Sequence, residues 1–117
     1  MNAQEVGNQL VGLFNEGKFD EIYQNLYSPE IVSIEADGME AKGFEGLQGK
    51  NQWWEENFET HSLKAEGPFP HGDGMFGVIY DMETTHKPSG QRSQSRELGI
   101  YQVKDGKICE ERFCYTQ

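Results

Sequence analysis

Two glutamates and one histidine in the C-terminal part of the chain could carry out acid–base chemistry. Glu97, Glu111 and His86 lie in the last three predicted strands. Side chains alternate between the two faces of a strand, and this alternation places all three on the face that also carries Tyr80 and Tyr101. Carboxylates crowded in a partly apolar cavity raise one another's pKa, so one can act as a base while another stays protonated as an acid. This chemistry suits proton abstraction next to a carbonyl, dehydration, or cyclisation of an aromatic precursor.

The rest of this face is apolar, as the wall of a ligand pocket with a polar rim would be. The predicted pocket residues come from the strands and from a preceding helix, which supplies two adjacent indoles, one expected in the core and one beside a cavity. They are Trp53, Trp54, Phe58, Phe76, Val78, Tyr80, Met82, Tyr101, Phe113 and Tyr115. We expect this pocket to take a small hydrophobic or aromatic molecule without a cofactor.

Structural roles for the same residues remain open. Glu97 and Glu111 have basic neighbours in Arg96 and Arg112, and surface ion pairs of this kind are common and weak. His86 stands next to a turn, where histidines are usually exposed, and the aromatic residues would fill a core in any case. The three histidines, His61, His71 and His86, have no ligand spacing, so no metal site is predicted.

Three long strands in succession must position these side chains. They are predicted over Met75–His86, Ser93–Lys104 and Lys107–Tyr115. Asp105-Gly106 supplies the positive-φ residues of a tight hairpin between the last two, and Lys87–Gln91 contains the Pro and Gly of a longer turn. An antiparallel meander follows, and because such a sheet is not stable alone in water, the preceding segments must cover one face.

The N-terminal half is predicted to supply that cover. Apolar residues at helical spacing indicate helices over Ala3–Glu16, Phe19–Tyr27 and Phe44–Phe58. Ile and Val content indicates a strand over Glu30–Ala36, and alternation indicates a short one over His61–Glu66. A loop rich in Pro and Gly joins this short strand to the meander. The prediction is one α+β domain over residues 1–117, in the order α-α-β-α-β-β-β-β, with three helices on the concave face of a curved, mostly antiparallel sheet.

Composition excludes several classes of function. The formal net charge of −10 argues against nucleic-acid binding, which depends on Lys and Arg neutralising phosphates. No apolar run approaches the ~20 residues of a membrane span, and the first residues lack the layout of a secretory signal, so we expect a cytoplasmic protein. Cys109 and Cys114 lie five residues apart on one strand and face opposite ways, which predicts free thiols.

Four short motifs resemble the SnoaL-like group of the nuclear transport factor two-like superfamily, which includes polyketide cyclases and relatives of ketosteroid isomerase. They are Gly17-Lys18-Phe19-Asp20, Leu26-Tyr27-Ser28-Pro29-Glu30-Ile31-Val32, Gly43 and Asp105-Gly106-Lys107-Ile108, and their order spans the whole chain. The resemblance implies a cystatin-like cone with a pocket open at one end. It also implies a homodimer through the outer sheet face, where Ile79, Leu98 and Ile100 form an apolar patch.

The resemblance also implies one catalytic position. Counted from Tyr27, Glu35 falls where ketosteroid isomerase has its aspartate base, although the apolar alternation of Val32, Ile34 and Ala36 would turn Glu35 outward. The positions of the two oxyanion donors are Val11 and Gly99, which have no proton to donate. Steroid isomerase activity is therefore not predicted.

Three functions follow as hypotheses. The first is a cofactor-independent isomerase, cyclase or dehydratase for a small hydrophobic or aromatic carbonyl compound, with Glu35 as candidate base. The second is a non-catalytic module that binds such a molecule, and the third is a dimerisation scaffold whose cone is filled by aromatic side chains.

Overall fold

Three helices and a six-stranded sheet make up the computed structural model, which describes residues 2–115. In chain order the elements are α1 (Ala3–Asn15), α2 (Phe19–Leu26), β1 (Tyr27–Ile34), β2 (Glu40–Lys42), α3 (Gly43–Asn57), β3 (Phe58–Pro70), β4 (Met75–His86), β5 (Gln91–Lys104) and β6 (Lys107–Cys114). The α+β class is confirmed, and so is the meander of β4, β5 and β6.

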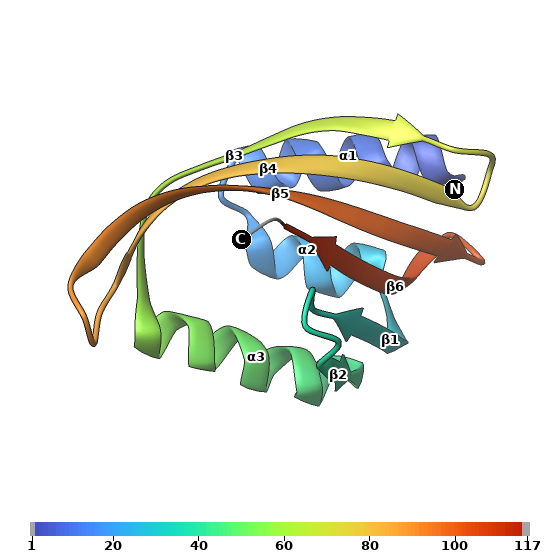
Figure 1. Ribbon diagram of the computed structural model, residues 1–117. Helices are drawn as coiled ribbons and strands as arrows, with labels where there is room; N and C mark the ends of the chain where they lie inside the picture. The colour runs from blue at the N-terminus through green and yellow to red at the C-terminus, as the bar shows by residue number, and fades with distance from the viewer. Residues whose placement is uncertain (1, 116–117) are drawn as a thin grey trace.

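The sheet is curved, with the strand order β2-β1-β6-β5-β4-β3. All neighbouring strands are antiparallel except β1 and β6, which are parallel. In Figure 1, α1 lies behind β3 and β4, α2 lies below β5, and α3 lies at the bottom, facing the end of the sheet where the β4–β5 hairpin curves downward. The concave side of the sheet therefore faces the helices, as predicted.

Three strands differ most from the prediction. Strand β1 begins at Tyr27 and ends at Ile34, whereas the prediction was Glu30–Ala36. The short strand β2 was missed because its three residues, Glu40–Lys42, are too few to show an alternating pattern, so the order becomes α-α-β-β-α-β-β-β-β. Strand β3 is also longer than His61–Glu66 and runs through Pro70. It lies at the edge of the sheet, where a proline costs no hydrogen bond on the open side.

Local sequence features explain where two of these elements begin and end. Asn2 caps α1 with its side chain on the backbone N–H of Glu5, and the Glu5 carboxylate returns to the backbone of Asn2 in a capping box. The β5–β6 turn has positive φ at both Asp105 and Gly106, the geometry that an Asp-Gly hairpin turn requires.

The core lies between α1, α2 and the concave face of the sheet. Its largest fully buried side chains include Leu10, Leu26, Ile31, Phe76 and Tyr101. At the C-terminus of α1, the Asn15 amide bonds both the N–H and the C=O of Ala65 on β3, and so fixes the helix to this edge strand. No helix in the described part of the chain is long and apolar enough to cross a membrane.

Candidate functional site

The sheet register brings the predicted acids to its concave face. Tyr101 and Ser33 both pair with Glu111, one from each neighbouring strand. Tyr80 pairs with Glu97. Residues directly opposite in neighbouring strands share a face, and the tyrosines belong to the core, so both glutamates point toward the helices.

Glu111 is a buried carboxylate with hydrogen-bonding neighbours, and its residue is 4% exposed. The Tyr27 hydroxyl donates to it from the start of β1, and the Ser33 hydroxyl donates to it from farther along the same strand. Burial raises the pKa of Glu111 above its ordinary value, while the Lys50 charge and the two hydrogen bonds offset part of that rise. Glu111 thus forms the inner end of a polar network.

Lys50 on α3 joins this network to Glu35. Its Nζ donates to Ser33 Oγ over 2.8 Å and forms an ion pair with the Glu35 carboxylate. The same ammonium lies 4.5 Å from the centre of the Phe113 ring, within the range of a cation–π contact. The Lys50 and Glu35 side chains are 28% and 31% exposed, so both remain accessible to a small molecule.

Glu35 therefore lies on the concave side, and the outward orientation suggested by the apolar alternation is wrong. That alternation took Val32, Ile34 and Ala36 as the core-facing set. In the structure Ile31 and Ser33 have almost no exposed surface, and Ile34 is buried on the opposite face. Because Glu35 follows Ile31 and Ser33 at period two, its side chain reaches the same side as theirs and meets Lys50.

Glu97 is half-buried and has no hydrogen-bond or ion-pair partner among residues 2–115. Burial raises the pKa of Glu97, the Glu35 carboxylate raises it further, and the Lys50 ammonium lowers it. The sheet register agrees with these influences: Lys50 lies over the Phe113 ring, and Phe113 pairs with Gly99, two residues from Glu97 on the same face of β5. We call Glu35, Lys50, Glu97 and Glu111, with Ser33 and Tyr27, the Lys50 cluster.

Sequence reasoning missed Lys50, although a pattern pointed to it. Leu47, Lys50 and Trp54 follow one another at spacings of three and four on α3, which places them on one helix face. Leu47 is buried and Trp54 half-buried, so Lys50 between them must also face inward.

Tyr80 and Tyr101 form a buried, hydrogen-bonded pair next to the cluster. Their hydroxyls hydrogen-bond to each other, and both residues are buried, which raises both pKa values. Gly99 lies between them on the sheet, and a Cβ there would come within 2.9–3.1 Å of the two rings. Position 99 is where the family resemblance places an oxyanion donor. The absence of a side chain there has a structural cause, since only glycine leaves room for the tyrosine pair.

Other predicted pocket residues belong to the core. Phe76 stacks on Tyr101 with ring centres 4.9 Å apart, and both Phe76 and Val78 have no exposed surface. Phe76 and Val78 therefore belong to the hydrophobic core and do not line an open pocket. Phe113 is half-buried and lies under the Lys50 ammonium. Tyr115 is 39% exposed, and its pKa is raised by burial and by Glu35, Asp37 and Glu97.

The remaining predicted residues gather at the C-terminal end of α3, where Trp54 lies about one helical turn beyond Lys50. Trp54 stacks on Phe58 at 4.2 Å, Trp53 is 57% exposed beside them, and His86 contacts the Phe58 ring at 5.1 Å. The His86 ring bonds Ser89 in the adjoining turn. His86 is six residues beyond Tyr80 on β4, about 20 Å along the strand, so it is not brought together with the glutamates. Met82 lies between the two groups and is half-buried.

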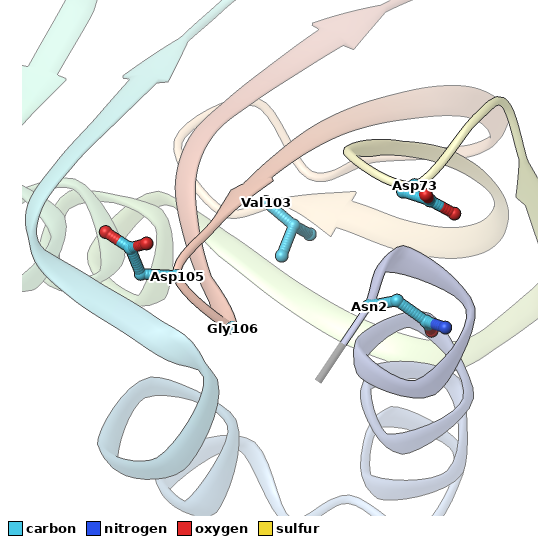
Figure 2. A pocket seen from close by; sticks show the side chains of 5 residues that line it. All are labelled: Asn2, Asp73, Val103, Asp105 and Gly106. Carbon is cyan, nitrogen blue, oxygen red and sulfur yellow. The ribbon is translucent and has the colours of Figure 1, made fainter.

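Two surface hollows lie apart from the Lys50 cluster. Figure 2 shows the first, about 480 Å³, where the N-terminus of α1 meets the β5–β6 turn; it is lined by Asn2, Asp73, Val103, Asp105 and Gly106. The second, about 640 Å³, lies over β3, β4 and β5 and includes Met82. Within residues 2–115, no three His, Cys, Asp or Glu side chains are arranged to hold a metal ion.

Comparison with known proteins assigns the family. The profile of the SnoaL-like domain matches residues 1–115. A Mesorhizobium loti protein of solved structure is 36% identical, with a TM-score of 0.91 over 98% of this chain and 100% of that one; it is described as a candidate SnoaL-like polyketide cyclase and, in brackets, as a carbohydrate phosphatase. No curated protein matches significantly.

More distant structures share the fold. A nuclear transport factor two-like protein from Burkholderia thailandensis has a TM-score of 0.83 at 11% identity, covering 99% of this chain and 92% of its own. A Catenulispora acidiphila protein with a ketosteroid isomerase-like fold, in complex with trimethylamine, has a TM-score of 0.75 at 12% identity, covering 96% and 85%. With a profile match over nearly its whole length and a full-length relative at 36% identity, this chain belongs to the SnoaL-like family.

Proposed function

We propose that this chain is a cofactor-independent acid–base enzyme, an isomerase, cyclase or dehydratase that acts on a small hydrophobic or aromatic carbonyl compound. The observation that carries the proposal is Glu97. A half-buried carboxylate with a raised pKa and no hydrogen-bond or ion-pair partner in the described chain is free to take a proton from a ligand.

The three glutamates then have different roles. Glu97 is the base. Glu35, the base implied by the family resemblance, is bound to Lys50, and taking a proton would break that ion pair, so we assign it the role of holding Lys50. Glu111 is buried behind them and positions Ser33 and Tyr27.

The names of relatives support the same reaction class. The Mesorhizobium loti relative is described as a candidate polyketide cyclase, and cyclisation of a polyketide requires removal of a proton next to a carbonyl. Fold alone hosts many activities, so the proposal depends on the Lys50 cluster rather than on the likeness.

Proton exchange provides a test that does not require the natural substrate. Small aryl ketones are incubated with the protein in deuterated buffer, and loss of the α-proton resonance is followed by NMR. We expect the wild-type protein to accelerate exchange for at least one ketone, and Glu97→Gln to lower that rate about 100-fold. The matched control is Glu59→Gln, which neutralises an exposed glutamate on β3. Failure of wild-type protein to accelerate exchange with every ketone, or full exchange by Glu97→Gln, contradicts the proposal.

A second candidate is a non-catalytic module that binds a small molecule. It is favoured by the Tyr80–Tyr101 pair, whose hydroxyls are turned to each other and buried instead of facing a ligand. The related fold that holds trimethylamine supports small-molecule binding as well. Saturable binding of an aryl ketone without any α-proton exchange would favour this candidate.

A further inference from the structure

Removal of a proton next to a carbonyl places negative charge on the carbonyl oxygen, and the proposed reaction needs a group to stabilise it. Tyr80 and Tyr101 are poorly placed, because both residues are buried and one of their two hydroxyl protons is used in the bond between them. Val11 and Gly99 have no side-chain donor. Lys50 is the remaining candidate, because its Nζ lies 4.5 Å from the centre of the Phe113 ring, and Phe113 pairs with Gly99, two residues from Glu97 on the same face of β5.

The Lys50 ammonium has unused hydrogen-bonding capacity. It carries three N–H groups. Ser33 accepts one at 2.8 Å and Glu35 accepts another, and no acceptor for the third occurs in the described part of the chain. The ring of Phe113 lies 4.5 Å from Nζ and limits hydration on one side, while 28% of the side chain stays exposed. A ligand oxygen can therefore bind the third N–H next to Glu97.

We propose that Lys50 is a catalytic residue that binds the carbonyl oxygen of the substrate and stabilises its enolate; this inference rests on the proposed function. Glu97 takes the proton from the α-carbon, the C–H electron pair forms the C=C bond, and the carbonyl π pair moves to the oxygen that Lys50 holds. The negative charge thus passes from Glu97 to the enolate and stays beside the ammonium. Return of the proton from Glu97 to carbon completes the cycle, and no other reactant is needed.

The charges around Lys50 also define the substrate class. Glu35 compensates the Lys50 charge before any ligand binds, and Glu97 and Glu111 add two more acidic groups. A permanent carboxylate or phosphate on the substrate near the reacting carbon would be repelled by these groups. The cluster therefore fits an uncharged, enolisable ketone or a phenol, whose anion forms only as Glu97 becomes neutral.

A phenolate resembles an enolate, so 4-nitrophenol is a probe for this oxygen site that is independent of turnover. Its anion absorbs visible light and its neutral form does not. Near or below the solution pKa of the probe, we expect the wild-type protein to increase the phenolate absorption on binding. Lys50→Met should weaken phenolate binding at least tenfold, or about 1.4 kcal/mol, and lower the exchange rate about 100-fold. Lys50→Arg retains the charge and should restore the phenolate absorption in part.

The variants separate a catalytic from a structural role. Since Lys50→Met leaves Glu35 without its partner, the double variant Lys50→Met with Glu35→Gln removes one charge of each sign and leaves the net charge of the cluster unchanged. It should fold, and it should lose phenolate binding as well. Lys104→Met, an exposed lysine outside the cluster, is the control. Glu97→Gln should bind the phenolate at least as tightly as wild type, because it removes a negative charge.

Unchanged phenolate absorption in both Lys50→Met variants overturns the inference, and so does a wild-type protein that does not bind the phenolate. If phenolate binding depends on Lys50 but no ketone exchanges its α-proton, the inference that Lys50 binds a ligand oxygen stands and the proposed enzymatic function fails. If exchange depends on Glu97 but not on Lys50, the function stands and the Lys50 inference fails.

Discussion

At the scale of single residues, the Lys50 cluster separates three glutamates by environment. Glu111 is buried with two hydroxyl donors, Glu35 is held in an ion pair, and Glu97 is half-buried without either. Similar side chains can have different chemistry when burial and partners differ, and this difference is the basis for assigning the base role to Glu97.

Glu111→Gln should change how stability depends on pH. Burial raises the pKa of Glu111 above its reference value of 4.5, so the folded chain binds this proton more tightly than the unfolded chain does. The stability that this group contributes is fully present below about 4.5 and is lost as the pH rises through the raised pKa. The variant lacks that loss, so its free energy of unfolding relative to wild type should increase over this pH range. Urea unfolding of both proteins at pH values across the range measures it.

The variant Glu59→Gln, at an exposed position, serves as the reference, because the difference between its free energy of unfolding and that of wild type should change little over the same pH range. A difference between Glu111→Gln and wild type that does not vary with pH would show that Glu111 titrates alike in the folded and unfolded chains.

At the scale of elements, α1 packs closely on β3 at a glycine. A Cβ at Gly7 would lie 2.6 Å from Pro68 Cβ, whereas one at Gly12, farther along the same helix, would meet nothing within 4 Å. The close approach of helix and edge strand therefore depends on the missing side chain at position 7.

Two alanine substitutions on α1 should have opposite effects. Gly7→Ala must separate α1 from β3 or distort both, and we expect a loss of about 1–3 kcal/mol in the free energy of unfolding. Gly12→Ala removes only the helix penalty of glycine, so we expect a gain of about 0.5–1 kcal/mol. Denaturant midpoints of the two variants and wild type provide the comparison; equal effects at the two positions would be inconsistent with the packing described.

Much of the sheet could be predicted from local pattern, and the reasons are physical. Alternation over β4 and β5 gave the inward orientation of Tyr80 and Glu97, and the Asp105-Gly106 turn fixed the β5–β6 pairing. The Lys50–Glu35 contact was beyond such reasoning, because it depends on how α3 packs on β1 and how far a long side chain reaches. The distance between His86 and the glutamates likewise follows from strand length and from which end of the sheet each residue occupies.

At the scale of the whole molecule, the outer sheet face carries an apolar patch that the helices leave uncovered. Leu98 is 39% exposed and Phe69 is 50% exposed, with half-buried Ile79 and Ile100 on the same face. Cross-strand ion pairs of Arg96 with Asp81 and Glu66 lie at its border. An apolar centre with a charged rim is the usual composition of a protein interface.

We predict a homodimer through this patch. Leu98→Asp places a charge at its centre and should convert the dimer to a monomer, because an unpaired charge is costly to bury. The matched control Gln48→Asp adds the same charge on the exposed side of α3 and should leave the mass unchanged. Light scattering coupled to size-exclusion chromatography measures the mass, and a wild-type monomer would contradict the prediction.

The pH dependence of ketone α-proton exchange tests the central claim, that Glu97 is the base of the Lys50 cluster. The base must be ionised, and burial and Glu35 raise the pKa of Glu97 above its reference value of 4.5. We therefore predict an enzyme-dependent rate that rises with pH through a midpoint above 4.5 and that loses this rise in Glu97→Gln. A rate that is independent of pH, or a midpoint that is the same in wild type and Glu97→Gln, would contradict it.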